Sequence, residues 1–205
     1  METISFLSTS KIVEALSAFH EALEAHKEPI NRLNVYPVPD GDTGTNMYLT
    51  VGSVIEELEG VESEDRQAVC EAISHGSLMG ARGNSGVILS QVLRGMSDCF
   101  SRSENIDSEL LTEALTESSI SADGAVMKPV EGTILTVVRE SARSAMKAKQ
   151  SGSITAVIEE ALAGGEIALE KTPEQLEVLR EAGVVDAGGA GFLLLLNAFL
   201  HVLDG

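Results

Sequence analysis

The strongest constraint on the fold of this chain is a spacing of three and four between apolar residues, which recurs along almost its whole length. Ile12, Leu16 and Phe19 show it first and would lie on one face of a helix that begins near residue 10. No segment convincingly alternates apolar and polar residues, as a half-buried strand would. The same spacing predicts further helices over residues 46–58, 66–78, 85–100, 110–118, 131–149, 154–162 and 190–203.

Thr172 and Pro173 predict one more, shorter helix. Threonine is favoured as an N-cap and proline at the first helical position, so this helix would run through residue 179 and stop near Gly183. Eight or nine helices with short connections make an all-α bundle. The length of 205 residues fits one domain over residues 1–205. The chain ends at Asp204 and Gly205, directly after an apolar helix, which predicts that it is the amino-terminal part of a longer polypeptide.

The charge balance argues against a protein that binds nucleic acid. The chain has 14 Lys and Arg residues against 32 Asp and Glu residues, a net charge of −18, whereas nucleic acids and anionic membranes need clustered cations. A polyphosphate could bind only if something else supplied positive charge. The most apolar stretch, residues 187–202, is interrupted by glycine and polar residues and predicts a buried core helix, with no membrane insertion. Because no signal sequence precedes the first helix, we expect a cytoplasmic protein.

The cysteines and histidines predict no metal centre of their own. Cys70 and Cys99 are too few for a disulfide framework and lack the close Cys or His neighbours of a zinc site, so we expect reduced, buried thiols. The four histidines show no metal-ligand spacing. Any metal site must therefore be sought among the carboxylates.

The connection over residues 34–47 is unusually rich in proline, glycine and acidic residues for a helical bundle. Pro37 and Pro39 stiffen the approach to Asp40 and Asp42. Their spacing of two lets both carboxylates converge on one hard cation. The alternative is that they only cap the following helix, which favours negative charge at its start. The hydroxyl-rich segment 43–46 favours the metal interpretation, because it opens a helix and offers backbone N–H groups to an anion.

A second glycine-rich connection covers residues 76–86. Glycines at 80, 83 and 86 would let the main chain approach a ligand, while Asn84 and Ser85 would lie at the start of the next helix. This pattern predicts a phosphate cradle without the lysine of a P-loop, and neither the P-loop nor the dinucleotide-binding fingerprint is present. A tight crossing of two helices is an equally good interpretation.

A third connection, residues 183–191, joins glycines to Asp186 before the last helix. It could equally be a helix C-cap followed by a flexible joint. Between the second and third connections, Thr133 could reach a phosphate or simply start a helix. For this segment taken alone, the helix start is the favoured interpretation.

Two segments carry a resemblance to a known family: LNVYPVPDGDTGTNM over residues 33–47 and GARGNSGVILSQ over residues 80–91. Together they resemble the amino-terminal domain of the bacterial fatty acid kinase A subunits, which is similar to the nucleotide-binding L domain of dihydroxyacetone kinases. The likeness extends over essentially the whole chain. It implies an antiparallel barrel of eight helices, with ATP or ADP and two magnesium ions held at one end by the loops between helices.

The resemblance also implies roles for individual residues. Asp40 and Asp42 match two metal-binding acids of the wider family, and Asn34 takes the place of the third. On charge alone, and not from the resemblance, Arg82 could join the two acids in catalysis by adding positive charge in the transition state; a surface or structural role is the alternative. The loop around Asp186 resembles the part that closes on the nucleoside. The implied nucleotide-binding residues are Thr43, Gly44, Thr45, Asn46, Gly83, Asn84, Ser85, Gly86, Thr133, Asp186, Gly188 and Gly189.

The activity that the resemblance implies is transfer of the γ-phosphoryl group of ATP to the carboxylate of a fatty acid, which gives an acyl phosphate. A separate fatty-acid-binding protein would present the acyl chain, and dimerisation would fall to domains beyond this one. A carboxylate acceptor needs no catalytic base at neutral pH. Two alternatives stay open: a subunit that holds ADP and magnesium as a fixed cofactor, and a helical scaffold whose glycine loops are only crossings.

Overall fold

The computed structural model describes residues 3–103 and 105–204, and these form ten α-helices with a single isolated β-bridge, between Leu7 and Ile106. The predicted all-α class is confirmed. The predictions that concern Met1 and Gly205 lie outside the described residues. The helices are α1 (Thr9–Leu33), α2 (Thr43–Leu58), α3 (Arg66–Met79), α4 (Gly83–Phe100), α5 (Ser108–Gly124), α6 (Ile134–Ala145), α7 (Ile154–Glu170), α8 (Thr172–Gln175), α9 (Glu177–Ala182) and α10 (Ala187–Asp204), with a short 3-10 helix, η1 (Met146–Ala148), after α6.

The eight longer helices close a ring. From α1 to α7 each helix packs on the next one along the chain, and α10 packs on both α7 and α1. Their apolar stripes meet inside the ring, where Phe19, Phe100, Phe192 and Phe199 are almost completely buried. Burial of these stripes, more than the intrinsic preference of any one segment, holds the helices in place.

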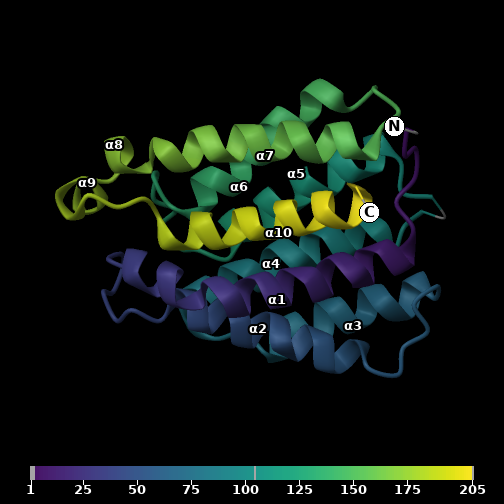
Figure 1. Ribbon diagram of the computed structural model, residues 1–205, viewed down its shortest axis with the longest axis horizontal. Coiled ribbons are helices and arrows are strands. Elements are labelled where there is room, and N and C mark those ends of the chain that lie inside the picture. The colour runs from purple at the N-terminus through teal and green to yellow at the C-terminus, as the bar shows by residue number, and fades with distance from the viewer. Residues whose placement is uncertain (1–2, 104, 205) are drawn as a thin grey trace.

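Successive long helices run in opposite directions, so their first turns divide between the two ends of the molecule. The helices α2, α4, α6 and α10 begin at one end, on the left in Figure 1, together with α8 and α9. The helices α1, α3, α5 and α7 begin at the other end. The three connections singled out in the sequence therefore gather at one end.

Several predicted helix boundaries are wrong in an informative way. The helix expected to start at residue 131 begins at Ile134, because Gly132 has φ +80° and Thr133 is the extended N-cap residue. The segment 172–179 forms two helices, since Leu176 between them is extended. Thr172 is the first residue of α8 and not its N-cap. These boundaries depend on turns that apolar spacing does not encode.

Other helices begin earlier than their apolar stripes. Thr43 and Gly83 start α2 and α4, and α10 starts at Ala187 instead of residue 190. Gly76 and Ser77 lie in the last turns of α3, so the second connection shrinks to residues 80–82. Most of the glycines assigned to loops therefore lie in the first or last turns of helices.

The last helix, α10, is long and apolar enough by composition to cross a membrane, and it is the one such helix among the described residues. Leu195, Leu196 and Phe199 nevertheless lie in the interior of the helical ring. The prediction of a buried core helix is confirmed. The prediction for the cysteines is confirmed too: Cys70 and Cys99 are buried free thiols, and desolvation raises the pKa of each to about 11.

Candidate functional site

A cavity of about 510 Å³ lies at the end of the molecule where α2, α4, α6 and α10 begin. Its size is within the usual range for small-molecule sites. The first turns of these four helices and the connections that precede them form its wall. The lining residues are Asn34, Tyr36, Pro37, Val38, Asp40, Asp42, Thr43, Asn46, Gly83, Asn84, Ser85, Val87, Ile88, Ala125, Val126, Met127, Lys128, Val130, Thr133, Ile134, Leu135, Asp186 and Gly188.

The two ends of the molecule differ in how their helices are capped. At the end away from the cavity, side chains of Ser8, Asp65, Asp107 and Ser153 accept hydrogen bonds from the first turns of α1, α3, α5 and α7. At the cavity end, the N-cap residues of α2, α4 and α6 make no such bond, although Asn31 accepts a hydrogen bond from one N–H group of α2 and Asp186 from one of α6. Their free N–H groups and positive dipole ends can therefore bind an anion.

Asp40 and Asp42 line the same cavity, as the sequence interpretation requires. Asp42 occupies the N-cap position of α2, yet its carboxylate makes no capping hydrogen bond to the helix. The alternative in which these acids serve only as caps therefore loses its main support. Two carboxylates side by side in one loop are a suitable donor set for Mg²⁺, which takes one or two carboxylates together with water and substrate phosphates.

The side chain of Asn34 connects residues of the loop that carries Asp40 and Asp42 through hydrogen bonds. Its side-chain amide is buried and donates to the carbonyl oxygen of Val38 at 2.8 Å and to Oδ1 of Asp40 at 2.9 Å. Its amide oxygen accepts a hydrogen bond from the Thr43 hydroxyl. An aspartate could not donate to Asp40, so the amide at this position orients a carboxylate that a third acid would repel.

The acids do not form a larger metal cluster. Within residues 3–103 and 105–204, no three or more His, Cys, Asp or Glu side chains come close enough to hold a metal ion. The remaining ligands of an ion at Asp40 and Asp42 would have to be water, amide or phosphate oxygens. Such a site would bind an ion together with its substrate more readily than the ion alone.

The start of α4 fits closely against α2. Gly83 has φ +58°, and a methyl group at this position would lie 2.3 Å from Nδ2 of Asn46. Only glycine fits both the backbone conformation and the space. The Ser85 hydroxyl lies 3.5 Å from the carbonyl oxygen of Thr43, so the first turns of α2 and α4 form one continuous wall.

Five of the predicted site residues lie outside the cavity. A methyl group at Gly44 would meet the backbone of Lys27 on α1, and one at Gly86 would meet the Thr50 hydroxyl. These glycines serve the helix crossings that the sequence left as an alternative. Gly189 packs on Val137, and Thr45 exchanges two hydrogen bonds with Asn31. The fifth residue, Arg82, is exposed, and its guanidinium group donates to the carbonyl oxygen of Ala81.

Asp186 joins the starts of α6 and α10. Its carboxylate is buried and accepts backbone hydrogen bonds from Gly189, at 2.7 Å, from Ile134 and from Gly188. Its own N–H group donates to the Thr172 hydroxyl at 3.1 Å. Desolvation raises the pKa of Asp186 to about 6, although the three N–H groups act in the opposite direction.

Replacing Asp186 with asparagine is expected to change the pH dependence of stability. In the wild-type protein the unfolded state loses the Asp186 proton near pH 4 and the folded state keeps it until about pH 6, so this group lowers stability as the pH rises through that interval. Asparagine does not titrate, and its one amide oxygen can accept at most two of the three N–H bonds. Denaturant unfolding should show that, as the pH rises from 4 to 7, the unfolding free energy of the variant increases by about 2–3 kcal/mol relative to that of wild type. Parallel profiles would contradict this.

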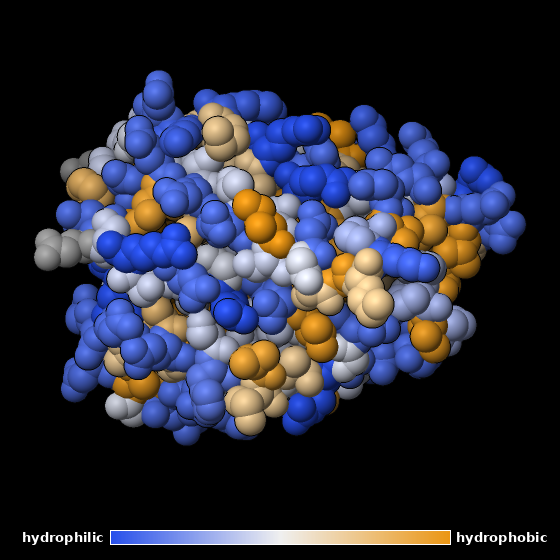
Figure 2. Space-filling view, turned by 180° about the vertical axis from the view of Figure 1, so that it is seen from behind, coloured by the Kyte–Doolittle hydropathy of each residue, from blue (hydrophilic) through white to orange (hydrophobic). Residues whose placement is uncertain are grey.

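The sequence interpretation missed one side of the cavity. In the sequence, Val87 and Ile88 are part of the apolar spacing that predicts the helix over residues 85–100, and residues 125–127, between α5 and α6, belong to no motif, yet all of them line the cavity. The side chains of Val38, Val87 and Met127 are all large, apolar and exposed around this cavity. The available signal in the sequence was an apolar methionine, Met127, next to Lys128 in a connection between two helices. Figure 2, which shows the molecule from behind with the cavity end at the right, has its apolar side chains gathered more densely toward that end.

Comparisons with known proteins agree with this site. The model of the DAK2 domain matches residues 37–201. Protein YloV of Bacillus subtilis is 44% identical over 204 residues, which cover 99% of this chain and 37% of that protein. Uncharacterized proteins of Staphylococcus saprophyticus and Staphylococcus aureus are 46% identical over 184 residues, or 89% of this chain and 33% and 34% of theirs.

The chain spans about a third of the length of these relatives. The family match nevertheless takes in all four helix starts that line the cavity, together with Asp40 and Asp42. A cavity walled by the starts of helices suits the phosphates of a nucleotide. The chain therefore belongs to the DAK2 domain family, a kinase-related family whose L-type domains bind nucleotide.

Proposed function

We propose that this chain is the ATP-binding domain of a fatty acid kinase, which transfers the γ-phosphoryl group of ATP to the carboxylate of a fatty acid and so forms an acyl phosphate. The observation that carries the proposal is that three helices begin beside two carboxylates in one cavity, and the N-cap residues of these helices make no capping bond. The sequences of residues 33–47 and 80–91 resemble those of fatty acid kinases, which supports a fatty acid carboxylate as the phosphoryl acceptor.

The charges of the cavity explain how a strongly acidic protein could hold ATP. The N–H groups at the starts of α2, α4 and α6 would bind phosphate oxygens, and Lys128 is the cationic side chain among the described lining residues. Asp40 and Asp42 would hold magnesium, which supplies positive charge between the carboxylates and the phosphates when it is bound. These fixed groups would stabilise the charge that develops on the transferred group.

The apolar side of the cavity suits the proposed acceptor. Val38, Val87 and Met127 come from three different elements and are exposed around one opening. A protein that presents an acyl chain could cover this surface and exclude water from the transfer. We therefore place the fatty-acid-binding partner on this side, in the cytoplasm, and assign dimerisation to parts of the protein beyond this chain.

The test has two steps. Calorimetry of this chain with ATP should show binding in magnesium and little or none in EDTA. Full-length protein should then release ADP when ATP and a fatty-acid-loaded binding protein are both present, and not when the partner is omitted. Retained ADP without turnover would indicate the nucleotide-holding subunit instead. If ATP shows no magnesium-dependent binding at all, the alternative of a helical scaffold without a nucleotide site would be supported.

A further inference from the structure

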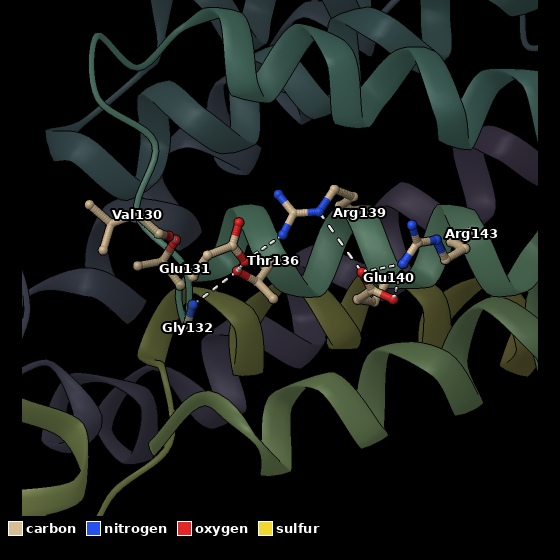
Figure 3. A network of polar contacts seen from close by, with 8 residues as sticks. Val130, Glu131, Gly132, Thr136, Arg139, Glu140 and Arg143 are labelled. Carbon is tan, nitrogen blue, oxygen red and sulfur yellow. Dashed lines mark hydrogen bonds and ion pairs between the residues drawn. The ribbon is translucent and has the colours of Figure 1, made fainter. Parts of the chain in front are cut away.

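The turn that brings Thr133 to the cavity is held from outside the cavity by a polar network. Figure 3 shows Glu131 folded back over the start of α6, where Oε2 accepts from the Thr136 hydroxyl at 2.9 Å and from Nη2 of Arg139 at 2.5 Å. The Thr136 hydroxyl in turn accepts from the N–H group of Gly132 at 2.9 Å. We call Glu131, Thr136 and Arg139 the clamp, because together they fix the Gly132–Thr133 turn to the beginning of α6.

The clamped turn has little room to move. Gly132 has φ +80°, and a methyl group there would lie 2.9 Å from both Cβ of Leu176 and the carbonyl oxygen of Thr172. On the cavity side, the Thr133 hydroxyl donates to the carbonyl oxygen of Val130 at 2.7 Å. It makes no capping bond to α6. The Ile134 N–H group is bound by Asp186, and the Thr133 turn is the other point that fixes the direction of the first turn of α6.

We propose that Glu131 and Arg139 are positioning residues for the nucleotide site, which fix the Gly132–Thr133 turn so that the start of α6 faces the polyphosphate. The proposal rests on the proposed function. Glu131 and Arg139 do not line the cavity, whereas Val130, Thr133 and Ile134 do. Burial alone would raise the pKa of Glu131, but the hydrogen bonds from Thr136 and Arg139 lower it, which keeps the clamp ionised.

A purely stabilising role would have a different consequence. The side chains of Glu131 and Arg139 are 60% and 35% exposed, and exposed ion pairs contribute about 0–1 kcal/mol to folding. Simple electrostatics also predicts opposite effects on ATP: removal of a negative charge should strengthen binding and removal of a positive charge should weaken it. Positioning instead predicts that either substitution weakens binding.

The experiment measures magnesium-dependent ATP affinity and amide hydrogen exchange for Glu131→Ala, Arg139→Ala and the double variant. We expect about tenfold weaker binding in each single variant, with little further loss in the double variant because both break one clamp. Arg139→Lys should recover part of the affinity. The control Arg143→Ala removes a more exposed arginine of the same helix, which contacts Glu140 and not the turn, and should bind ATP within twofold of wild type.

Hydrogen exchange separates this proposal from the proposed function, since it needs no ligand. The N–H groups of Thr136 and Val137 donate to the carbonyl oxygen of Thr133, and that of Gly132 donates to Thr136. These amides should exchange faster in both single variants and at the wild-type rate in Arg143→Ala. Unchanged exchange, or ATP binding in Glu131→Ala as tight as in wild type, would overturn the positioning role. Absence of ATP binding in wild type would instead count against the nucleotide site.

Discussion

Replacing Asp42 with asparagine is expected to weaken magnesium-dependent ATP binding on the order of 100-fold, about 2.7 kcal/mol, while the protein stays folded. The carboxylate lines the cavity beside Asp40 and makes no capping bond to α2. Its loss would remove half of the anionic ligand set of the cation, but no contact that holds the helices together. Calorimetry gives the affinity, and circular dichroism with thermal unfolding checks the fold.

The matched control for this change is Asp98→Asn. It removes the same charge from an exposed position on α4 that lies outside the cavity. Its ATP affinity should equal that of wild type, which separates a local effect from the general effect of one fewer negative charge. Wild-type protein in EDTA should resemble Asp42→Asn in magnesium. Wild-type affinity in Asp42→Asn would mean that the loop has only a structural role.

Replacing Gly44 with alanine is expected to destabilise the fold by about 3 kcal/mol, the upper part of the usual range for overpacking. The added methyl group would lie 2.3 Å from the carbonyl oxygen and 2.8 Å from Cα of Lys27. These are backbone atoms of α1, so the two helices would have to separate to relieve the contact. For a domain of this size the melting temperature should fall by about 6–12 °C.

Gly124→Ala is the control for Gly44→Ala. Gly124 is the last residue of α5, and an added methyl group would meet no atom within 4 Å among the described residues. This change should be neutral or stabilise the protein by about 0.5 kcal/mol, because alanine restricts the unfolded chain. A melting temperature for Gly44→Ala within two degrees of wild type would show that the α1–α2 crossing is not tight.

The helical class could be predicted from the sequence because each long helix buries one apolar stripe. The start of α1 near residue 10 follows from the same pattern. The starts of α2 and α10 could not be placed in this way, because Thr43, Gly44 and Gly188 are not part of any apolar stripe. These residues become helical through packing, since Gly44 lies against α1 and Gly188 beside Ile134 and Asp186.

The sequence could predict which segments form the candidate site, but not which of their residues line the cavity and which pack between helices. The sequence pointed to Asp40, Asp42 and Ser85, and the structure brings them to one cavity. It could not tell Gly83, which lines that cavity, from Gly44, which packs on another helix. That difference depends on which residue lies opposite each glycine. That the N-cap residues of α2, α4 and α6 make no capping bond is likewise a property of the folded chain.

The most direct test of the metal–nucleotide site is a crystal structure with magnesium and a non-hydrolysable ATP analogue. We expect a magnesium ion bound by the carboxylates of Asp40 and Asp42, and phosphate oxygens bound by N–H groups at the cavity end of α2, α4 and α6. A nucleotide bound elsewhere, or one in this cavity with both carboxylates turned away from any cation, would contradict the proposed site.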